Sequence, residues 1–456
     1  MYFLFLLAFS LASNPFPQDD FGTNIEILIP GDIYIGLLTE ITVSTDGNQC
    51  GDPVPHRVQL VHHAIKIVQK INEDPLILPN ISIGLIIRDQ CKSDSVTIQR
   101  AIQMLTCPLL KVLHVGNCSS QDHDVKAFVG SGSSSVAIQL SHFLQTFNIV
   151  QVSASSTSPE LSNRERFPFF YRTIPPDDKQ AEAIIKLLLH YNITYFSIVF
   201  EGSSYGSTLL DYLEQKLQKY SNICVAIAIQ INKDEGFATK DEFLEAANTL
   251  KQHIKAKVIL LIDSWLYMEQ ELDFALKLIG LDGWFQFMGS EGVQLSEGDL
   301  TSFKGMIAIS ALNTLSNSTA TEFQSFLKNT DWVNSQVQFP LERWTAEVLL
   351  KCDFDIKGSC PENSGELLAD LWFPSMYTAQ MEDAIVAVAM GFNSIWKSFC
   401  FDQQSVACKD FVNFKSSLLA EYIPNVTFKS KFNCLCNNNC NIIRSKIQAT
   451  VTNRLK

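Results

Sequence analysis

The stretch Gly130–Asp177 reads GSGSSSVAIQLSHFLQTFNIVQVSASSTSPELSNRERFPFFYRTIPPD, and it decides the fold. An apolar run directly before it, Val125–Val129, predicts a strand, and the apolar periodicity after the first serines predicts a helix from about Ser134. A second apolar run, Val150–Ala154, predicts a neighbouring strand that ends in the hydroxyl cluster Ser153–Ser158. Two hydroxyl-rich turns are therefore expected at the ends of adjacent strands.

The first of these turns caps a helix, and a helix N-terminus offers unpaired N–H groups and a positive dipole end. Such a turn suits a carboxylate or a phosphate. It lacks the glycines of a dinucleotide fingerprint and the Gly-Lys-Ser/Thr of a P-loop, so a nucleotide is less favoured. Serine is also a common cap and turn residue, and the motif alone favours that structural role.

The composition bounds the class of protein. With 456 residues, 46% hydrophobic and 18% charged, the chain has room for two or three globular domains with sizeable cores. A formal charge of −13 argues against nucleic acid or an anionic membrane surface as the main partner.

The first residues and the cysteines indicate an extracellular protein. Residues 1–13, MYFLFLLAFSLAS, have the pattern of a secretory signal peptide, and no later run is long and apolar enough for a transmembrane helix. Twelve cysteines in such a chain favour disulfides over metal or redox chemistry. The expected glycosylation sites are Asn80, Asn117, Asn192, Asn317 and Asn425.

Short apolar runs alternate with helical patterns along most of the chain. This alternation predicts parallel α/β layers with helices on both faces of each sheet, built as two lobes with ligand binding at the carboxyl ends of the strands. We expect residues 24–173 and 304–428 in the first lobe and 174–303 in the second. The strands are predicted at Asn24–Pro30, Ile81–Asp89, Val125–Val129, Val150–Ala154, Tyr195–Phe200, Cys224–Ile231, Lys257–Ile262, Phe285–Ser290 and Met306–Ser310.

Four phrases in this order carry a family resemblance: KINEDPLILPNISIGLIIRDQC (Lys70–Cys91), VGSGSSSVAIQ (Val129–Gln139), RTIPPDDKQAEA (Arg172–Ala183) and EGSSYG (Glu201–Gly206). They resemble the extracellular Venus-flytrap domain of class C G-protein-coupled receptors, across residues 24–428. The resemblance implies a two-lobed fold of the type I periplasmic-binding-protein kind. It also implies that the lobes close on a small-molecule ligand, a free L-amino acid.

The resemblance assigns the backbone end of that amino acid. Ser134 matches the serine that holds the α-carboxylate, and Ser155 lines the same site. Thr157 matches the residue that meets the α-amino group through its hydroxyl and carbonyl. Asp177 matches the acidic residue near the ammonium group. Alternatively, Asp177 could cap the helix that follows it.

From the second lobe, Tyr205 matches the tyrosine whose ring faces the ammonium, although it could equally pack as any loop tyrosine. Glu291 falls where glutamate receptors carry an aspartate and the calcium-sensing receptor a glutamate. The resemblance implies that a ligand touching both lobes favours the closed form.

Two positions depart from the glutamate receptors. Leu60 and Tyr377 stand where those receptors carry the arginine and the lysine that clamp the ligand's side-chain carboxylate. Because a buried carboxylate without a partner costs several kcal/mol, we expect a neutral or apolar side chain rather than glutamate. Arg57 lies one helical turn before Leu60 but is not placed in the pocket by the motif, and Trp265 could narrow it.

The cysteines fit the same family. The resemblance implies the disulfides Cys50–Cys91, Cys352–Cys360 and Cys400–Cys408, and an interchain bond at Cys118 in a homodimer or heterodimer. Cys224 matches a cysteine that pairs with the cysteine-rich domain of the family, so here it could pair with Cys434, Cys436 or Cys440 or be free, and the tail 429–456 is expected to return to the second lobe. A helix face resembles the family's dimer surface and is as readily explained as core: Val136, Leu140, Phe143 and Phe147.

The expected function is thus the amino-acid-sensing region of a receptor whose cysteine-rich domain and seven-helix bundle are absent from this chain. The alternatives are a secreted amino-acid-binding protein and a peptide-binding region of the guanylyl-cyclase receptor type. We expect no enzyme activity, no cofactor and no metal, since the eight histidines show no metal-binding spacing and His62-His63 is not part of an HExxH motif.

Overall fold

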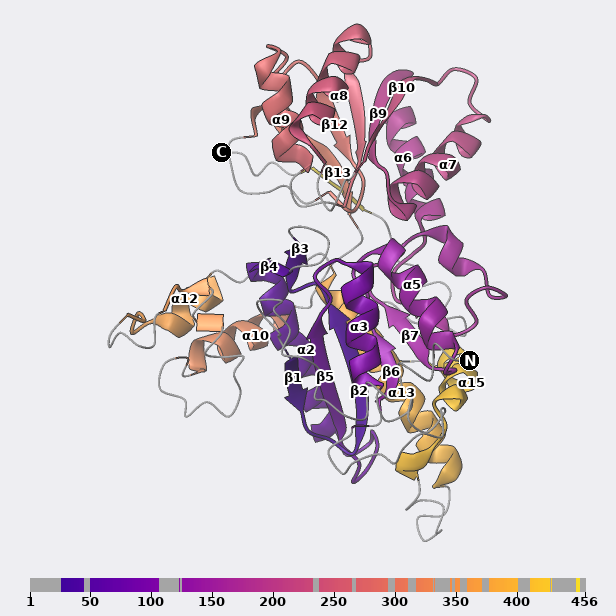
Figure 1. The fold of residues 1–456 in the computed structure, drawn as a ribbon, viewed down its shortest axis with the longest axis vertical. Helices are drawn as coiled ribbons and strands as arrows, with labels where there is room; N and C mark the ends of the chain where they lie inside the picture. The colour runs from indigo at the N-terminus through magenta and orange to yellow at the C-terminus, as the bar shows by residue number, and fades with distance from the viewer. Residues whose placement is uncertain are drawn as a thin grey trace, which may run out of the picture.

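The computed structural model places most of the chain in two lobes, one above the other in Figure 1. The structural statements below concern the residues that the structure describes. These are 26–44, 50–105, 123, 125–232, 238–264, 268–293, 300–310, 317–330, 332, 345–346, 349–352, 359–370, 377–400, 411–426, 428 and 448–451.

The first lobe is built on a six-stranded sheet with the order β1-β5-β2-β6-β7-β8. All neighbours are parallel except β1, which runs antiparallel to β5 at the edge. The strands are β1 (Glu26–Ile29), β2 (Ile33–Thr39), β5 (Ile83–Asp89), β6 (Val125–Val129), β7 (Val150–Ser153) and β8 (Phe170–Arg172). A short hairpin, β3 (Thr42–Ser44) and β4 (Cys50–Pro53), lies beside it.

Helices cover both faces of this sheet and bury most of its strands on both sides. In β2, Ile35 packs with helices α2 (Pro55–Glu73) and α13 (Thr378–Phe399), while Leu38 packs with α3 (Asp94–Met104) and α5 (Ser134–Gln145). The apolar face of α5 contributes Leu140 to this second core, and Val136 on the same face is buried as well. The dimer-surface interpretation of that face is therefore wrong for these two residues.

The second lobe has another six-stranded sheet, with the order β10-β9-β11-β12-β13-β14. Its strands are β9 (Tyr195–Glu201), β10 (Cys224–Ile231), β11 (Val258–Ile262), β12 (Gln286–Gly289), β13 (Ile307–Ser310) and the antiparallel β14 (Gln448–Val451). Helices α6 (Asp177–His190) and α7 (Ser204–Leu217) cover one face, and α8 (Lys240–Gln252) and α9 (Met268–Leu278) cover the other.

Smaller elements complete the description. Helices α10 (Asn317–Asn329) and α12 (Ser364–Asp370) pack together at the side of the first lobe, near α2 (Figure 1). The short helix α15 (Leu419–Tyr422) packs on α13. Among the described residues, no helix is long and apolar enough to cross a membrane.

The predicted α/β fold class is confirmed, with two corrections. The sequence reading missed β2, the central strand of the first sheet, because Gly36 interrupts its apolar run and a Gly-Asp turn separates it from β1. The return to the first lobe was expected at residue 304, but β13 pairs with β12 in the second sheet. The chain therefore leaves the second sheet only after Ser310.

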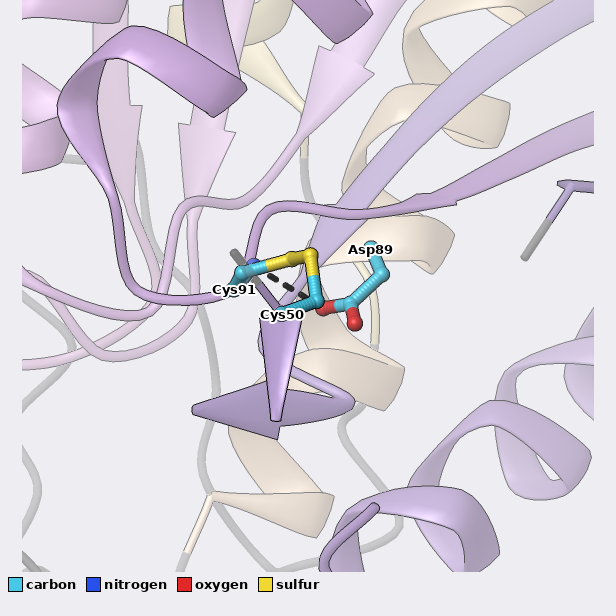
Figure 2. Close-up of side chains that lie close together, drawn as sticks. All are labelled: Cys50, Asp89 and Cys91. Carbon is cyan, nitrogen blue, oxygen red and sulfur yellow. Dashed lines mark hydrogen bonds between the residues drawn. A yellow bond between two sulfur atoms is a disulfide. The ribbon is translucent and has the colours of Figure 1, made fainter. Parts of the chain in front are cut away.

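A disulfide joins the hairpin to the end of β5. Cys50 and Cys91 are bonded, with Cα atoms 5.2 Å apart, beside the buried carboxylate of Asp89 (Figure 2). This carboxylate accepts hydrogen bonds from the backbone N–H groups of Ile41 (2.9 Å) and Cys91 (2.9 Å). The disulfide and the hydrogen bonds of Asp89 hold the backbone just after β2 in place. Because both sulfurs are in the disulfide, these three side chains do not form a metal site.

Candidate functional site

The serine-rich turn after β6 is held against the turn after β7. Gly130 has φ +121°, and a Cβ at this position would come within 2.0 Å of the carbonyl oxygen of Leu38, so only glycine fits. The carbonyl oxygen of Ser131 lies within hydrogen-bond distance of the hydroxyls of Ser153 (3.0 Å) and Ser156 (3.2 Å). The two turns therefore form one rigid unit at the carboxyl ends of the strands.

Ser134 is the first residue of α5 and is buried. Its hydroxyl accepts a hydrogen bond from the backbone N–H of Ser158 at 3.1 Å, so it also joins the two turns. Arg172, at the end of β8, donates to the carbonyl oxygens of Ser156 (3.2 Å) and Ser158 (2.9 Å). Burial lowers the pKa of Arg172 to about 10, which keeps it charged at neutral pH.

Four of the six expected ligand-binding residues meet in one buried polar cluster: Thr157, Asp177, Tyr205 and Glu291. They come from both lobes, because Thr157 follows β7 of the first lobe, whereas Asp177 begins α6, Tyr205 lies on α7 and Glu291 follows β12 in the second. Asp177 begins α6, but the N-cap residue there is Pro176 and Asp177 makes no capping hydrogen bond with its side chain. The helix-cap interpretation of Asp177 is therefore not supported.

Gln180 connects this cluster, and the sequence reading missed it. Its side-chain amide donates to Asp177 Oδ1 at 2.8 Å, and its carbonyl oxygen accepts from the backbone N–H of Glu291 at 2.7 Å. The hydroxyl of Tyr205 lies 3.4 Å from the same amide nitrogen. The sequence spacing could have indicated Gln180, because it lies three residues after Asp177 and residues three apart on a helix share a face.

The two carboxyl groups of the cluster are poorly compensated. Burial raises the pKa of Asp177 to about 7, although the Arg172 guanidinium opposes the shift. Burial, and then the charge of Asp177, raises the pKa of Glu291 well above its usual range. Asp177 Oδ2 makes no hydrogen bond with any described residue. The cluster is thus a buried acidic site that a cation would stabilise.

An open cleft adjoins the serine turns. Ser155 lines it, as do Leu60 and Tyr377, the two positions that depart from the glutamate-clamping pattern. Arg57 lines it as well and forms an ion pair with Glu40, with Arg57 Nη1 and Glu40 Oε2 3.2 Å apart.

Two contacts tie the cleft to the second lobe. Lys92, in the first lobe, lines the cleft and donates to the carbonyl oxygen of Ser264 at 2.6 Å. Ser264 follows β11 and is held by the carboxylate of Glu201, which accepts from its backbone N–H at 3.0 Å. Tyr377 lies close to both the acidic cluster and the cleft. Burial raises its pKa most, and the nearby charges of Glu291 and Asp177 in the cluster and of Glu40 in the cleft raise it further.

The remaining expected residues are placed as follows. The structure bonds Cys352 to Cys360, with Cα atoms 4.7 Å apart, and Cys400 is also in a disulfide, while its expected partner Cys408 lies outside the described residues. Cys224 is exposed and unbonded among the described residues. Of the glycosylation sites, Asn80, Asn192 and Asn425 are exposed and Asn317 begins α10. The positions outside the described residues are Asn117, Cys118, Trp265, Cys434, Cys436 and Cys440.

Comparisons with known proteins extend the sequence resemblance. The model of a family described as a receptor family ligand binding region matches residues 61–431. One curated relative is a metabotropic glutamate receptor from Drosophila melanogaster, 31% identical over 231 residues. The match covers 48% of this chain and 23% of that relative. The chain therefore spans less than a quarter of the length of the receptor it matches.

Proposed function

The chain belongs to the family of receptor ligand-binding regions and is a Venus-flytrap domain like those of class C G-protein-coupled receptors; on this premise we propose that it binds a free L-amino acid by closing its two lobes. The observation that carries the proposal is the buried cluster of Asp177 and Glu291, with Thr157 and Tyr205 beside them. Two carboxyl groups without a full counter-charge favour a bound ammonium group.

The serine turns support the carboxylate end of such a ligand. They present the N-terminus of α5 to the cleft, and Ser131, Ser133 and Ser155 line it. The ammonium cluster and the serine turns adjoin each other, since Ser134 and Ser158 share a hydrogen bond one residue from Thr157. An amino-acid zwitterion would place its carboxylate at the hydrogen-bond donors of the serine turns and its ammonium group at the acidic cluster.

We propose a neutral side chain for the ligand, although the relative above is a glutamate receptor by name. Leu60 and Tyr377 line the cleft and provide no cation. Two other lining residues are cations. The carboxylate of Glu40 lies 3.2 Å from Arg57 and would repel a ligand carboxylate, and the ammonium group of Lys92 is bound to the carbonyl oxygen of Ser264 in the second lobe. Lobe closure would then depend on contacts from both lobes, because a ligand shifts an equilibrium only by its differential affinity for the two states.

We further propose that the domain is extracellular and works as a dimer. The disulfides Cys50–Cys91 and Cys352–Cys360 and the exposed sequon residues Asn80 and Asn192 support an extracellular location. The interchain bond at Cys118 stays a prediction.

A thermal-shift panel of the free L-amino acids tests the proposal, because a ligand that binds only the folded state raises the melting temperature. At least one neutral amino acid should stabilise the protein. Thr157→Ala should weaken that ligand by about 1–3 kcal/mol, roughly fivefold to 150-fold in Kd. Thr146→Ala, at the exposed end of α5, is the matched control and should leave Kd unchanged. A panel without any shift would refute amino-acid binding.

A further inference from the structure

The Glu40–Arg57 ion pair lies in the cleft where the ligand's side chain would extend. Glu40 directly follows β2 and Arg57 is in the first turn of α2, and both are less than a tenth exposed. The carboxylate of Glu40 is fixed from two other sides. Gln90 Nε2 donates to Glu40 Oε1 at 3.3 Å, and Gly132 lies so close that a Cβ there would come within 2.6 Å of the same oxygen.

The pair keeps hydrogen-bonding capacity for a ligand. Arg57 and Glu40 both line the cleft, and the contact between their charged groups is that of Arg57 Nη1 with Glu40 Oε2 at 3.2 Å. A guanidinium has five N–H donors and a carboxylate about four acceptor positions, far more than these contacts use. Donors and acceptors that stay unpaired in a buried site cost free energy, so a ligand that supplies both partners gains affinity.

Each class of side chain meets this pair differently. A carboxylate is attracted by Arg57 but repelled by Glu40. An ammonium group is attracted by Glu40 but repelled by Arg57. An aliphatic side chain would displace water from both charges without replacing its hydrogen bonds. A carboxamide supplies a carbonyl oxygen for Arg57 and an N–H donor for Glu40. Lys92, the other cation of the cleft, donates one of its three N–H groups to the carbonyl oxygen of Ser264, which holds its ammonium group toward the second lobe.

We propose that the Glu40–Arg57 pair selects a carboxamide side chain, so that the preferred ligand is L-glutamine or L-asparagine. This inference rests on the proposed binding of a free amino acid, and it adds which side-chain chemistry the cleft reads. The residues that recognise the side chain are then distinct from Thr157 and Asp177, which recognise the backbone end.

Calorimetric titration of the purified chain with L-glutamine, L-asparagine, L-glutamate, L-lysine and L-leucine tests the proposal. We expect one carboxamide to bind at least about tenfold more tightly than glutamate, lysine and leucine, a lower bound, because a site built to hydrogen-bond a group rejects analogues without it more strongly than that. Glu40→Gln removes the repulsion and leaves Arg57 uncompensated, so glutamate should gain at least about tenfold relative to glutamine. Glu382→Gln, at a buried glutamate of the same lobe outside the cleft lining, is the matched control and should keep the wild-type ranking.

The outcomes separate the two proposals. If glutamate, lysine or leucine binds most tightly, and Thr157→Ala weakens it, the carboxamide inference is overturned and amino-acid binding stands. An unchanged ranking in a folded Glu40→Gln variant also overturns the inference. If that variant does not fold, the wild-type ranking decides alone. If no amino acid binds the wild-type protein, both proposals fall.

Discussion

Raising the pH from about 6 to about 8 should tighten amino-acid binding, because Asp177 must lose a proton to pair with an ammonium group. Its pKa is raised to about 7 by burial, so at the lower pH most molecules carry a proton on this carboxyl. The ammonium of a free amino acid keeps its own proton over this range. Binding therefore releases a proton from the protein, and the affinity rises with pH.

The magnitude follows from that pKa. The carboxyl of Asp177 is about nine-tenths protonated one pH unit below its pKa and about one-tenth protonated one unit above it. The apparent Kd should therefore fall about tenfold between pH 6 and pH 8. The stability of the ligand-free protein should instead fall as the pH rises. The folded state holds a proton that the unfolded state has already lost, so its free energy of unfolding decreases as the pH rises from about 4 to about 7.

Calorimetric titrations at several pH values, in two buffers of different ionisation enthalpy, measure both the affinity and the released proton. Asp177→Asn should bind more weakly and lose most of the pH dependence between 6 and 8. Asp241→Asn is the matched control, since this exposed carboxylate lies in the first turn of another second-lobe helix, α8, and should leave the pH dependence unchanged. An affinity that stays constant over this range, or the same slope in Asp177→Asn, would refute the role given to this carboxyl.

The remaining predictions concern stability, measured by urea unfolding. Gln180→Ala should lower the free energy of unfolding by about 2–4 kcal/mol, because it leaves a carboxylate and a backbone N–H of the buried cluster without their hydrogen bonds. Gly130→Ala should lower the free energy of unfolding by about 2–4 kcal/mol, through backbone strain and a clash with the carbonyl oxygen of Leu38. Gly280→Ala, which also has a positive φ but has no atom within 4 Å of the added Cβ, should lower it by about 1 kcal/mol. Equal losses in the two variants would contradict the clash. Replacing both cysteines of Cys50–Cys91, 41 residues apart, by alanine should cost about 4 kcal/mol, against about 2.5 kcal/mol for Cys352–Cys360, 8 residues apart; the reverse order would contradict the loop-entropy argument.

Hydrophobic periodicity was sufficient for most of the fold. The bounds predicted for Val125–Val129 and Cys224–Ile231 agree with β6 and β10, because both strands are short runs in which apolar residues predominate. The same rule failed for β2, where Gly36 breaks the run. A glycine in a strand lowers the signal, although here the missing side chain leaves room for Phe128, which a Cβ would approach to 2.8 Å.

The error at β2 extended to the site. Glu40 follows directly after this strand, so the sequence reading had no reason to place it at the carboxyl end of the sheet opposite Arg57. Lys92 was missed for a different reason, because its hydrogen bond to Ser264 depends on how the two lobes meet. Periodicity places residues on strands and helices, but it does not determine contacts between lobes.

The hydrogen bonds that lock the two serine turns together have a consequence for how ligand preference could change. Hydrogen bonds among Ser131, Ser156 and Arg172 join the turns that form the proposed backbone end of the site. The side-chain end is supplied by β2, α2 and the start of α13, which do not take part in that network. If the domain binds an amino acid as we propose, one or two substitutions there could redirect it to another amino acid while the zwitterion is still held in the same way. Recognition would then be divided into a constant part and an adjustable one.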